Sequence, residues 1–127
     1  MDVLIRFGFT IDEIKDMMDT NTSIDSILDK EIYELISILE KIGCNRDVIR
    51  NIFICNPFYI TRSVNEVNDL IKKLLEIGFT NLDLLFDTNP YILNMTDEDV
   101  SKLYDKMSTE GLEKDEIINY INYNIIY

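Results

Sequence analysis

Carboxylates are the side chains of this chain best suited to chemistry, because the sequence contains no histidine and only two cysteines. The run DTNTSID at residues 19–25 alternates oxygen-bearing side chains, as the start of a calcium-binding loop does. The sixth position of such a loop needs glycine for its turn, but here it is Ile24. The twelfth position needs a bidentate glutamate, but here it is Lys30. We therefore expect no calcium site in this run.

Other reactive groupings are also incomplete. Without histidine the chain cannot build a histidine general base or a histidine-containing triad, and two cysteines are too few for the usual four-ligand zinc site. The acidic run 97–99 lies where a helix would begin, and carboxylates there favour the helix dipole. The four glycines are isolated, so no glycine-rich phosphate loop exists. The sequence predicts a protein that is not an enzyme and that has no catalytic residue, cofactor or metal.

Basic side chains gather in the centre of an otherwise acidic chain, whose formal net charge is −12. From Lys41 to Lys73 six basic residues face three acidic ones, a local charge of +3 that leaves −15 for the remainder. Five of them are candidate contacts with phosphate or with a partner's carboxylates: Arg46, Arg50, Arg62, Lys72 and Lys73. Arg46 and Arg50 stand one helical turn apart and share a face. The alternative is that these are ordinary solvated side chains, balanced by neighbouring acidic residues.

A repeating pattern surrounds these basic residues: an apolar residue, glycine, a second apolar residue and a polar cap. It occurs at 7–10, 42–45 and 77–80, and more loosely at 110–113. The steps from glycine to glycine are 35, 35 and 33 residues. A fixed period of this size with helical patterning inside each unit is typical of helical repeat proteins.

Long and short helices alternate within the repeat. Apolar residues at i, i+3, i+4 and i+7 predict long helices over about 30–42, 64–77 and 97–110, each ending at a glycine. Short helices follow the glycines, with Ile14, Ile49, Leu84 and Ile117 at equivalent positions, six residues after each glycine. Helix starts are expected at Asp29 and at three capping boxes, Thr10 with Glu13, Ser63 with Glu66 and Thr96 with Asp99.

Each short helix ends in a polar break, at residues 21–22, 56–57 and 89–90. The second and third breaks are Asn-Pro, and the apolar residues after them are too few for a full helix, so a 3₁₀ turn is expected after Pro57 and Pro90. No stretch alternates in the manner of a strand. The fold class is therefore all-α: residues 1–127 form a single curved helical-repeat (solenoid) domain of about three and a half repeats of 33–35 residues.

The location expected for this domain is cytoplasmic. No apolar run approaches the roughly 20 residues that span a bilayer, and the start MDVLIRFGFT lacks the pattern of a secretory signal. Cys44 occupies an apolar position of the repeat and Cys55 lies at the end of a short helix, so we expect free thiols rather than a disulfide.

The end of the chain is rich in isoleucine and tyrosine. Tyr120, Tyr123 and Tyr127 follow helical spacing on one side, and isoleucines follow it on another, from Ile117 to Ile125. A helix that is apolar on two sides cannot bury both against one preceding repeat. Either the last turns fold back onto the domain, or the tyrosines contact a partner, which would include a second copy in a weak homodimer.

Residues 74–79 (LLEIGF), the short helix after them, the break NPYIL at 89–93 and the following long helix resemble the mTERF family, the mitochondrial transcription termination factors. The most diagnostic feature is a proline with an apolar residue three positions later, Pro57 with Ile60 and Pro90 with Leu93. The resemblance implies repeats of two α-helices and a 3₁₀ helix stacked in a superhelix that binds nucleic acid along a basic concave face. This chain departs from that pattern in its acidity, its small number of repeats and Thr22 in place of the first proline.

Three functions follow from these observations, in order of preference. The first is a non-enzymatic helical-repeat module that binds a protein partner. The second, from the resemblance, is a nucleic-acid-binding protein that uses the basic central repeat, although the net charge disfavours a phosphate backbone. The third is an acidic mimic of nucleic acid that inhibits a nucleic-acid-handling protein. No membrane partner is expected.

Overall fold

The structure is a computed structural model that describes residues 2–124, and within them it is all-helical with no β-strand. Its elements in chain order are α1 (Asp2–Phe7), α2 (Ile11–Thr20), η1 (Thr22–Ser26), α3 (Asp29–Lys41), α4 (Arg46–Cys55), η2 (Pro57–Thr61), α5 (Val64–Ile77), α6 (Leu82–Thr88), η3 (Pro90–Asn94), α7 (Asp97–Thr109) and α8 (Lys114–Tyr123), where η denotes a 3₁₀ helix.

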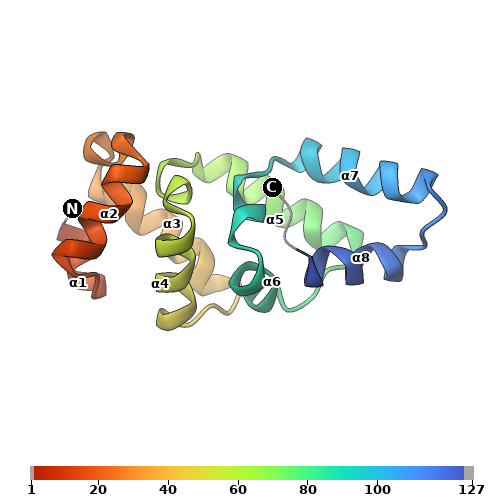
Figure 1. The fold of residues 1–127 in the computed structure, drawn as a ribbon, viewed down its shortest axis with the longest axis horizontal. Helices are drawn as coiled ribbons and strands as arrows, with labels where there is room; N and C mark the ends of the chain where they lie inside the picture. The colour runs from red at the N-terminus through yellow and green to blue at the C-terminus, as the bar shows by residue number, and fades with distance from the viewer. Residues whose placement is uncertain (1, 125–127) are drawn as a thin grey trace.

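These elements form three stacks along an elongated molecule, from α1 at one end to α7 and α8 at the other (Figure 1). The long-helix stack runs α1, α3, α5, α7, and the short-helix stack runs α2, α4, α6, α8. The 3₁₀ helices η1, η2 and η3 pack one against the next. Because every element packs on its counterpart in the neighbouring repeat, the predicted helical-repeat architecture is confirmed.

The predicted long helices agree with the observed ones to within one residue at each end, and the 3₁₀ helices begin at Pro57 and Pro90 as expected. Two capping boxes also form as predicted. The backbone N–H of Glu13 donates to the Thr10 hydroxyl (3.1 Å), and Thr10 N–H donates back to the Glu13 carboxylate (2.8 Å). Thr96 and Asp99 make the same pair of bonds.

Two other helix starts differ from the prediction. Ser63 is the N-cap of α5 but makes no side-chain capping bond. Glu66, its expected partner, instead forms an ion pair with Arg62 at 2.9 Å. Asp29 is the first residue of α3 rather than its cap, which is Leu28. Its carboxylate is still placed where it favours the helix dipole.

The third short helix, α6, has a different register from the one that the glycine spacing indicates. Counted from the glycine, Leu84 is equivalent to the buried Ile49, yet it is 61% exposed. The buried residues of α6 are instead Leu82, Leu85 and Phe86. The residues of α6 that face the core therefore differ from those that the spacing from Gly78 predicts.

A two-residue shortening before α6 explains the shift. Asn89 lies eleven residues after Gly78, whereas Asn56 lies thirteen after Gly43. The connection is tightened at Asn81, whose φ of 49° is left-handed, a conformation that asparagine tolerates better than most residues. Counted back from the asparagine at the break, the buried positions of α6 coincide with those of α4, at seven, four and three residues before it.

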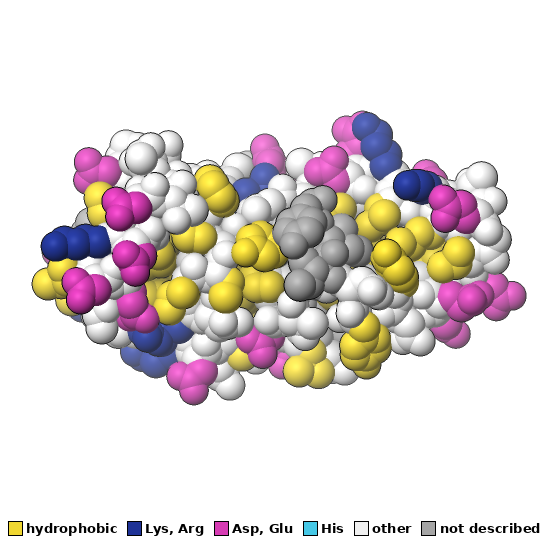
Figure 2. Space-filling model, in the orientation of Figure 1, with side chains coloured by type: hydrophobic (Ala, Val, Ile, Leu, Met, Phe, Trp, Pro, Cys, Tyr) yellow, Lys and Arg dark blue, Asp and Glu magenta, His cyan; other side chains and the backbone are white. Residues whose placement is uncertain are grey.

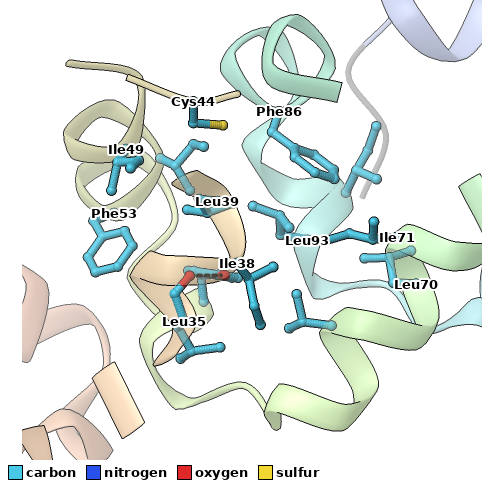
Figure 3. Packing of buried hydrophobic residues seen from close by; sticks show 14 of the residues in the cluster. Leu35, Ile38, Leu39, Cys44, Ile49, Phe53, Leu70, Ile71, Phe86 and Leu93 are labelled. Atoms are coloured by element: carbon cyan, nitrogen blue, oxygen red, sulfur yellow. Dashed lines mark hydrogen bonds between the residues drawn. The ribbon is translucent and has the colours of Figure 1, made fainter. Parts of the chain in front are cut away.

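One hydrophobic core runs through the repeats. Figure 3 shows its central part, where Leu35 and Leu39 of α3 meet residues of α4, α5, α6 and η3. The buried Tyr59 hydroxyl donates to the Leu35 carbonyl oxygen (2.8 Å), so its polar atom is satisfied. No helix among residues 2–124 is long and apolar enough to cross a membrane.

Three buried asparagines join successive repeats, and we call them the inter-repeat asparagines: Asn21, Asn56 and Asn89. Each lies at the break after a short helix, and its side-chain amide donates two hydrogen bonds to the next repeat, all of 2.7–3.2 Å. The acceptors are, in chain order, Pro57 O and Thr61 Oγ1, Pro90 O and Asn94 Oδ1, and Ile121 O and Asn124 O. These bonds fix the spacing between repeats, and the asparagines that donate them are themselves buried.

Candidate interaction surfaces

Arg46 and Arg50, two of the candidate phosphate contacts, are placed on the first turns of α4 and bind the preceding repeat. The Arg46 guanidinium donates to the carbonyl oxygen of Phe7 and lies 4.7 Å from the centroid of its ring. Arg50 donates to the carbonyl oxygen of Gly8 (2.6 Å) and lies 5.1 Å from the ring centroid of Phe9. Both arginines therefore contact the end of α1 and the turn that follows it.

The chemistry of a helix end explains this arrangement. The last carbonyl groups of α1 have no partner within the helix, and they form the negative end of its dipole. A guanidinium satisfies them and adds a favourable contact with an aromatic face. Arg50 also pairs with the Glu13 carboxylate at 3.0 Å. The pKa of Glu13 is lowered, first by its hydrogen bond from the Thr10 backbone and then by the hydrogen bond and charge of Arg50.

Arg62 makes the corresponding contact between the second and third repeats. Its Nε donates to the Leu93 carbonyl oxygen (3.0 Å), and Nη2 donates to that of Met95 (2.8 Å). Nη1 pairs with Glu66, and the side chain is only 15% exposed. Three of the five candidate cations thus donate to backbone carbonyl oxygens of a neighbouring repeat.

The two candidate lysines lie together on α5. Lys72 is exposed, and Lys73 lies 3.7 Å from Glu76 of the same helix. Neither lysine takes part in the contacts between repeats that the arginines make. A phosphate contact through any of the five residues stays a prediction. The contacts that engage the arginines join residues 31–42 positions apart in the sequence, which local spacing could not reveal.

The C-terminal helix α8 turns its isoleucines inward and its tyrosines outward. Ile117 and Ile121 are buried in the stack, while Tyr120 is 47% and Tyr123 80% exposed. Tyr127 lies outside the described residues. The isoleucine side of this helix therefore faces the core, and the tyrosine side faces the surface.

A hollow of about 230 Å³ lies between α6 and α8. Leu84 and Tyr123 face it from opposite sides, and its other lining residues are uncharged: Thr80, Asn81, Leu85, Thr88 and Asn122. We call Leu84, Tyr120 and Tyr123 the α6–α8 surface. The shift of register in α6 is what places Leu84 on it.

Residues 2–124 contain both thiols and all the side-chain carboxylates of the chain. No group of three or more His, Cys, Asp or Glu side chains in this part of the chain could hold a metal ion. Both cysteines are free, as expected. Burial raises the pKa of the Cys44 thiol to about 12, so it carries no nucleophilic thiolate near neutral pH.

In a comparison with known families, residues 1–123 match the family described as mTERF. The match covers nearly the whole chain and both ends of the helical stack. Comparison with curated proteins finds no match, and comparison with solved structures finds none either.

Proposed function

We propose that this chain, which belongs to the mTERF family, is a non-enzymatic binding module that acts through contact with another protein. Members of this family are helical-repeat proteins that generally bind nucleic acid. The proposal for this member therefore differs from the family's general property. It includes a cytoplasmic setting, with which two free cysteines agree.

The observation that carries the proposal is the use made of the arginines. Nucleic-acid binding draws on cationic side chains that are free to meet phosphates. Here Arg46, Arg50 and Arg62 donate to carbonyl oxygens between repeats. Since acidic residues outnumber basic ones by 24 to 12, the surface that remains repels a phosphate backbone.

The α6–α8 surface supports contact with a protein. Leu84, Tyr120 and Tyr123 are large apolar or amphipathic side chains that lie exposed on adjacent helices. Figure 2 shows hydrophobic side chains spread across the middle of one face, with acidic ones mostly toward its edges. Tyrosines surrounded by polar groups are characteristic of protein interfaces. A weak homodimer through the same surface is part of this proposal.

Nucleic-acid binding is the second candidate, favoured by membership of the family. The exposed Lys72 and its neighbour Lys73 are the cations that would carry it. Inhibition by mimicry of nucleic acid is a third, which rests on the net charge of −12. In that case the partner would be a nucleic-acid-handling protein bound through acidic side chains.

Affinity capture from a lysate of the native host, with and without nuclease treatment, separates these functions. We expect a protein partner that is retained after nuclease treatment and lost with Tyr120→Ser/Tyr123→Ser. The control variant Lys72→Glu/Lys73→Glu should retain it. Loss of all capture after nuclease treatment would overturn the proposal in favour of nucleic-acid binding. Capture that is indifferent to the tyrosines but abolished by moderate salt would support mimicry.

A further inference from the structure

The turns that follow α1, α3 and α5 share one backbone conformation but differ in the side chain that lies over them. Their glycines, Gly8, Gly43 and Gly78, have φ values of 103–120°. In each case the side chain nearest to the glycine comes from the short helix of the next repeat. The carbonyl groups at these turns form the negative end of a helix dipole, so a cation is the favourable neighbour.

The first and third of these turns have such a cation. Arg46 Nη1 lies 3.5 Å from the position that a Cβ on Gly8 would occupy, and Lys114 Nζ lies 3.0 Å from the corresponding position on Gly78. Arg46 and Lys114 occupy the same place in their repeats, three residues after a glycine. The repeat therefore uses a basic side chain over the end of a long helix in two places.

The middle turn, at Gly43, has a carboxylate instead. The nearest side-chain atom is Cγ of Asp83, 4.0 Å from the position that a Cβ on Gly43 would occupy. Asp83 lies six residues before Asn89, as Arg50 lies six residues before Asn56. The chain thus places an acid where the preceding repeat has an arginine that donates to a carbonyl oxygen.

This reversal of charge leaves acceptors without a donor. The carbonyl oxygens of Phe7 and Gly8 accept from the two arginines of α4. Their counterparts, by the shift of 35 residues, belong to Ile42 and Gly43, and no group among residues 2–124 donates a hydrogen bond to either. The Asp83 carboxylate has no hydrogen bond or ion pair within the same residues. We call these two carbonyl oxygens and the Asp83 carboxylate the α3 terminus.

The α3 terminus is negative and open to solvent. Gly43 is exposed and Asp83 is half-buried. Burial, and then the charges of Asp83 and Asp87, raise the pKa of the adjacent Cys44 thiol. Asp87 accepts from a neutral donor, the amide of Asn51, at 3.0 Å. A carboxylate beside the negative end of a helix dipole is unfavourable, so a bound cation would be stabilised here.

We propose that the α3 terminus binds an arginine side chain of the partner protein. One guanidinium can donate to a carbonyl oxygen and a carboxylate at once, as Arg50 does with Gly8 and Glu13. Calcium requires about six to eight oxygen ligands, and no group of three or more acidic, cysteine or histidine side chains within residues 2–124 could hold a metal. The inference rests on the proposed binding of a protein and adds the chemistry of one contact.

The test is an NMR titration of the isotope-labelled full chain with the peptide acetyl-Gly-Arg-Gly-Tyr-amide. A matched peptide has citrulline in place of arginine, which keeps the shape of the side chain and removes its charge. We expect saturable shifts centred on the backbone amides of Gly43, Cys44 and Asp83. The citrulline peptide should bind at least about fivefold more weakly, because the charge-assisted contact is lost.

Substitutions of aspartate complete the test. Asp83→Asn should weaken the arginine peptide about tenfold. Asp105→Asn removes an exposed carboxylate of α7 and should leave the affinity within about twofold. Asp83→Arg should abolish binding and raise the melting temperature, because its guanidinium would repeat the contact that Arg50 makes with Gly8.

No binding, shifts spread over the whole acidic surface, or equal weakening by the two asparagine variants would overturn the inference. Calcium chloride alone is titrated in parallel. Saturable shifts of the same amides with calcium, absent from Asp83→Asn, would identify a metal site and would also overturn it. None of these results alters capture through Tyr120 and Tyr123, so the inference and the proposed function fail separately.

Discussion

The inter-repeat asparagines show why a polar residue is buried at each break. An amide has two N–H donors, and each of these asparagines uses its amide to reach two acceptors of the next repeat. Asparagine also stands at the first break, where proline is replaced by Thr22, and η1 still forms. Within this chain the asparagine therefore recurs at every break, whereas the proline does not. This recurrence is the feature of the sequence from which these contacts could have been predicted.

Asn56→Ala should lower the free energy of unfolding by about 2–3 kcal/mol, because it leaves the Pro90 carbonyl oxygen buried without its donor. Asn119→Ala, an exposed change on α8, is the control and should stay within about 0.5 kcal/mol. Urea denaturation followed by circular dichroism measures both. Similar losses in the two variants would contradict the role assigned to Asn56.

The two thiols should differ strongly in reactivity. Cys55 is exposed at the end of α4, whereas Cys44 is buried with a raised pKa. Iodoacetamide at neutral pH should modify Cys55 in the native protein and should modify Cys44 only after unfolding. Peptide mass spectrometry after timed quenching gives both rates. Equal native-state rates would show that the core around Cys44 opens readily.

The Glu13 carboxylate should make stability depend on pH. Its native pKa is lowered, so its contribution is fully present above the unfolded value of about 4.3 and is lost as the pH falls through the native value. The difference in free energy of unfolding between the wild type and Glu13→Gln should therefore shrink as the pH is lowered from neutral towards about 3. Denaturant titrations across that range measure it. A difference that grows on acidification would have the wrong sign.

At the level of helices, much of the fold could be predicted from the sequence. Apolar spacing and the closing glycine place α5 at its observed bounds and α3 within one residue. These signals are local, so they survive without knowledge of the tertiary structure. The capping box predicted at Ser63 does not form, because Glu66 pairs with Arg62 instead. The contacts of the arginines could not be predicted from local spacing, because their acceptors lie one repeat away.

The α6 register gives a test with neighbouring leucines. Leu85 is 1% exposed and should cost about 3 kcal/mol when changed to alanine, because a cavity is left in the core. Leu84→Ala, at an exposed position, should cost less than about 0.5 kcal/mol. Thermal and urea unfolding of the two variants decide the matter. The opposite order would mean that the register counted from Gly78 is the true one.

For the whole molecule, charge and architecture point in different directions. The family and the stacked helices favour a nucleic-acid-binding superhelix, while the net charge of −12 opposes it. The structure adds that the arginines between residues 46 and 62 contribute to repeat packing. The composition indicated the charge, but only the contacts between repeats indicate how these cations are used.

The central claim is that these cations hold repeats together and that the domain binds protein rather than nucleic acid. The most direct test is the fluorescence anisotropy of labelled duplex DNA and RNA titrated with wild-type protein over a series of salt concentrations. We predict no detectable binding at about 150 mM salt. Binding to either duplex at that concentration, with an affinity that falls steeply as salt increases, would contradict the claim.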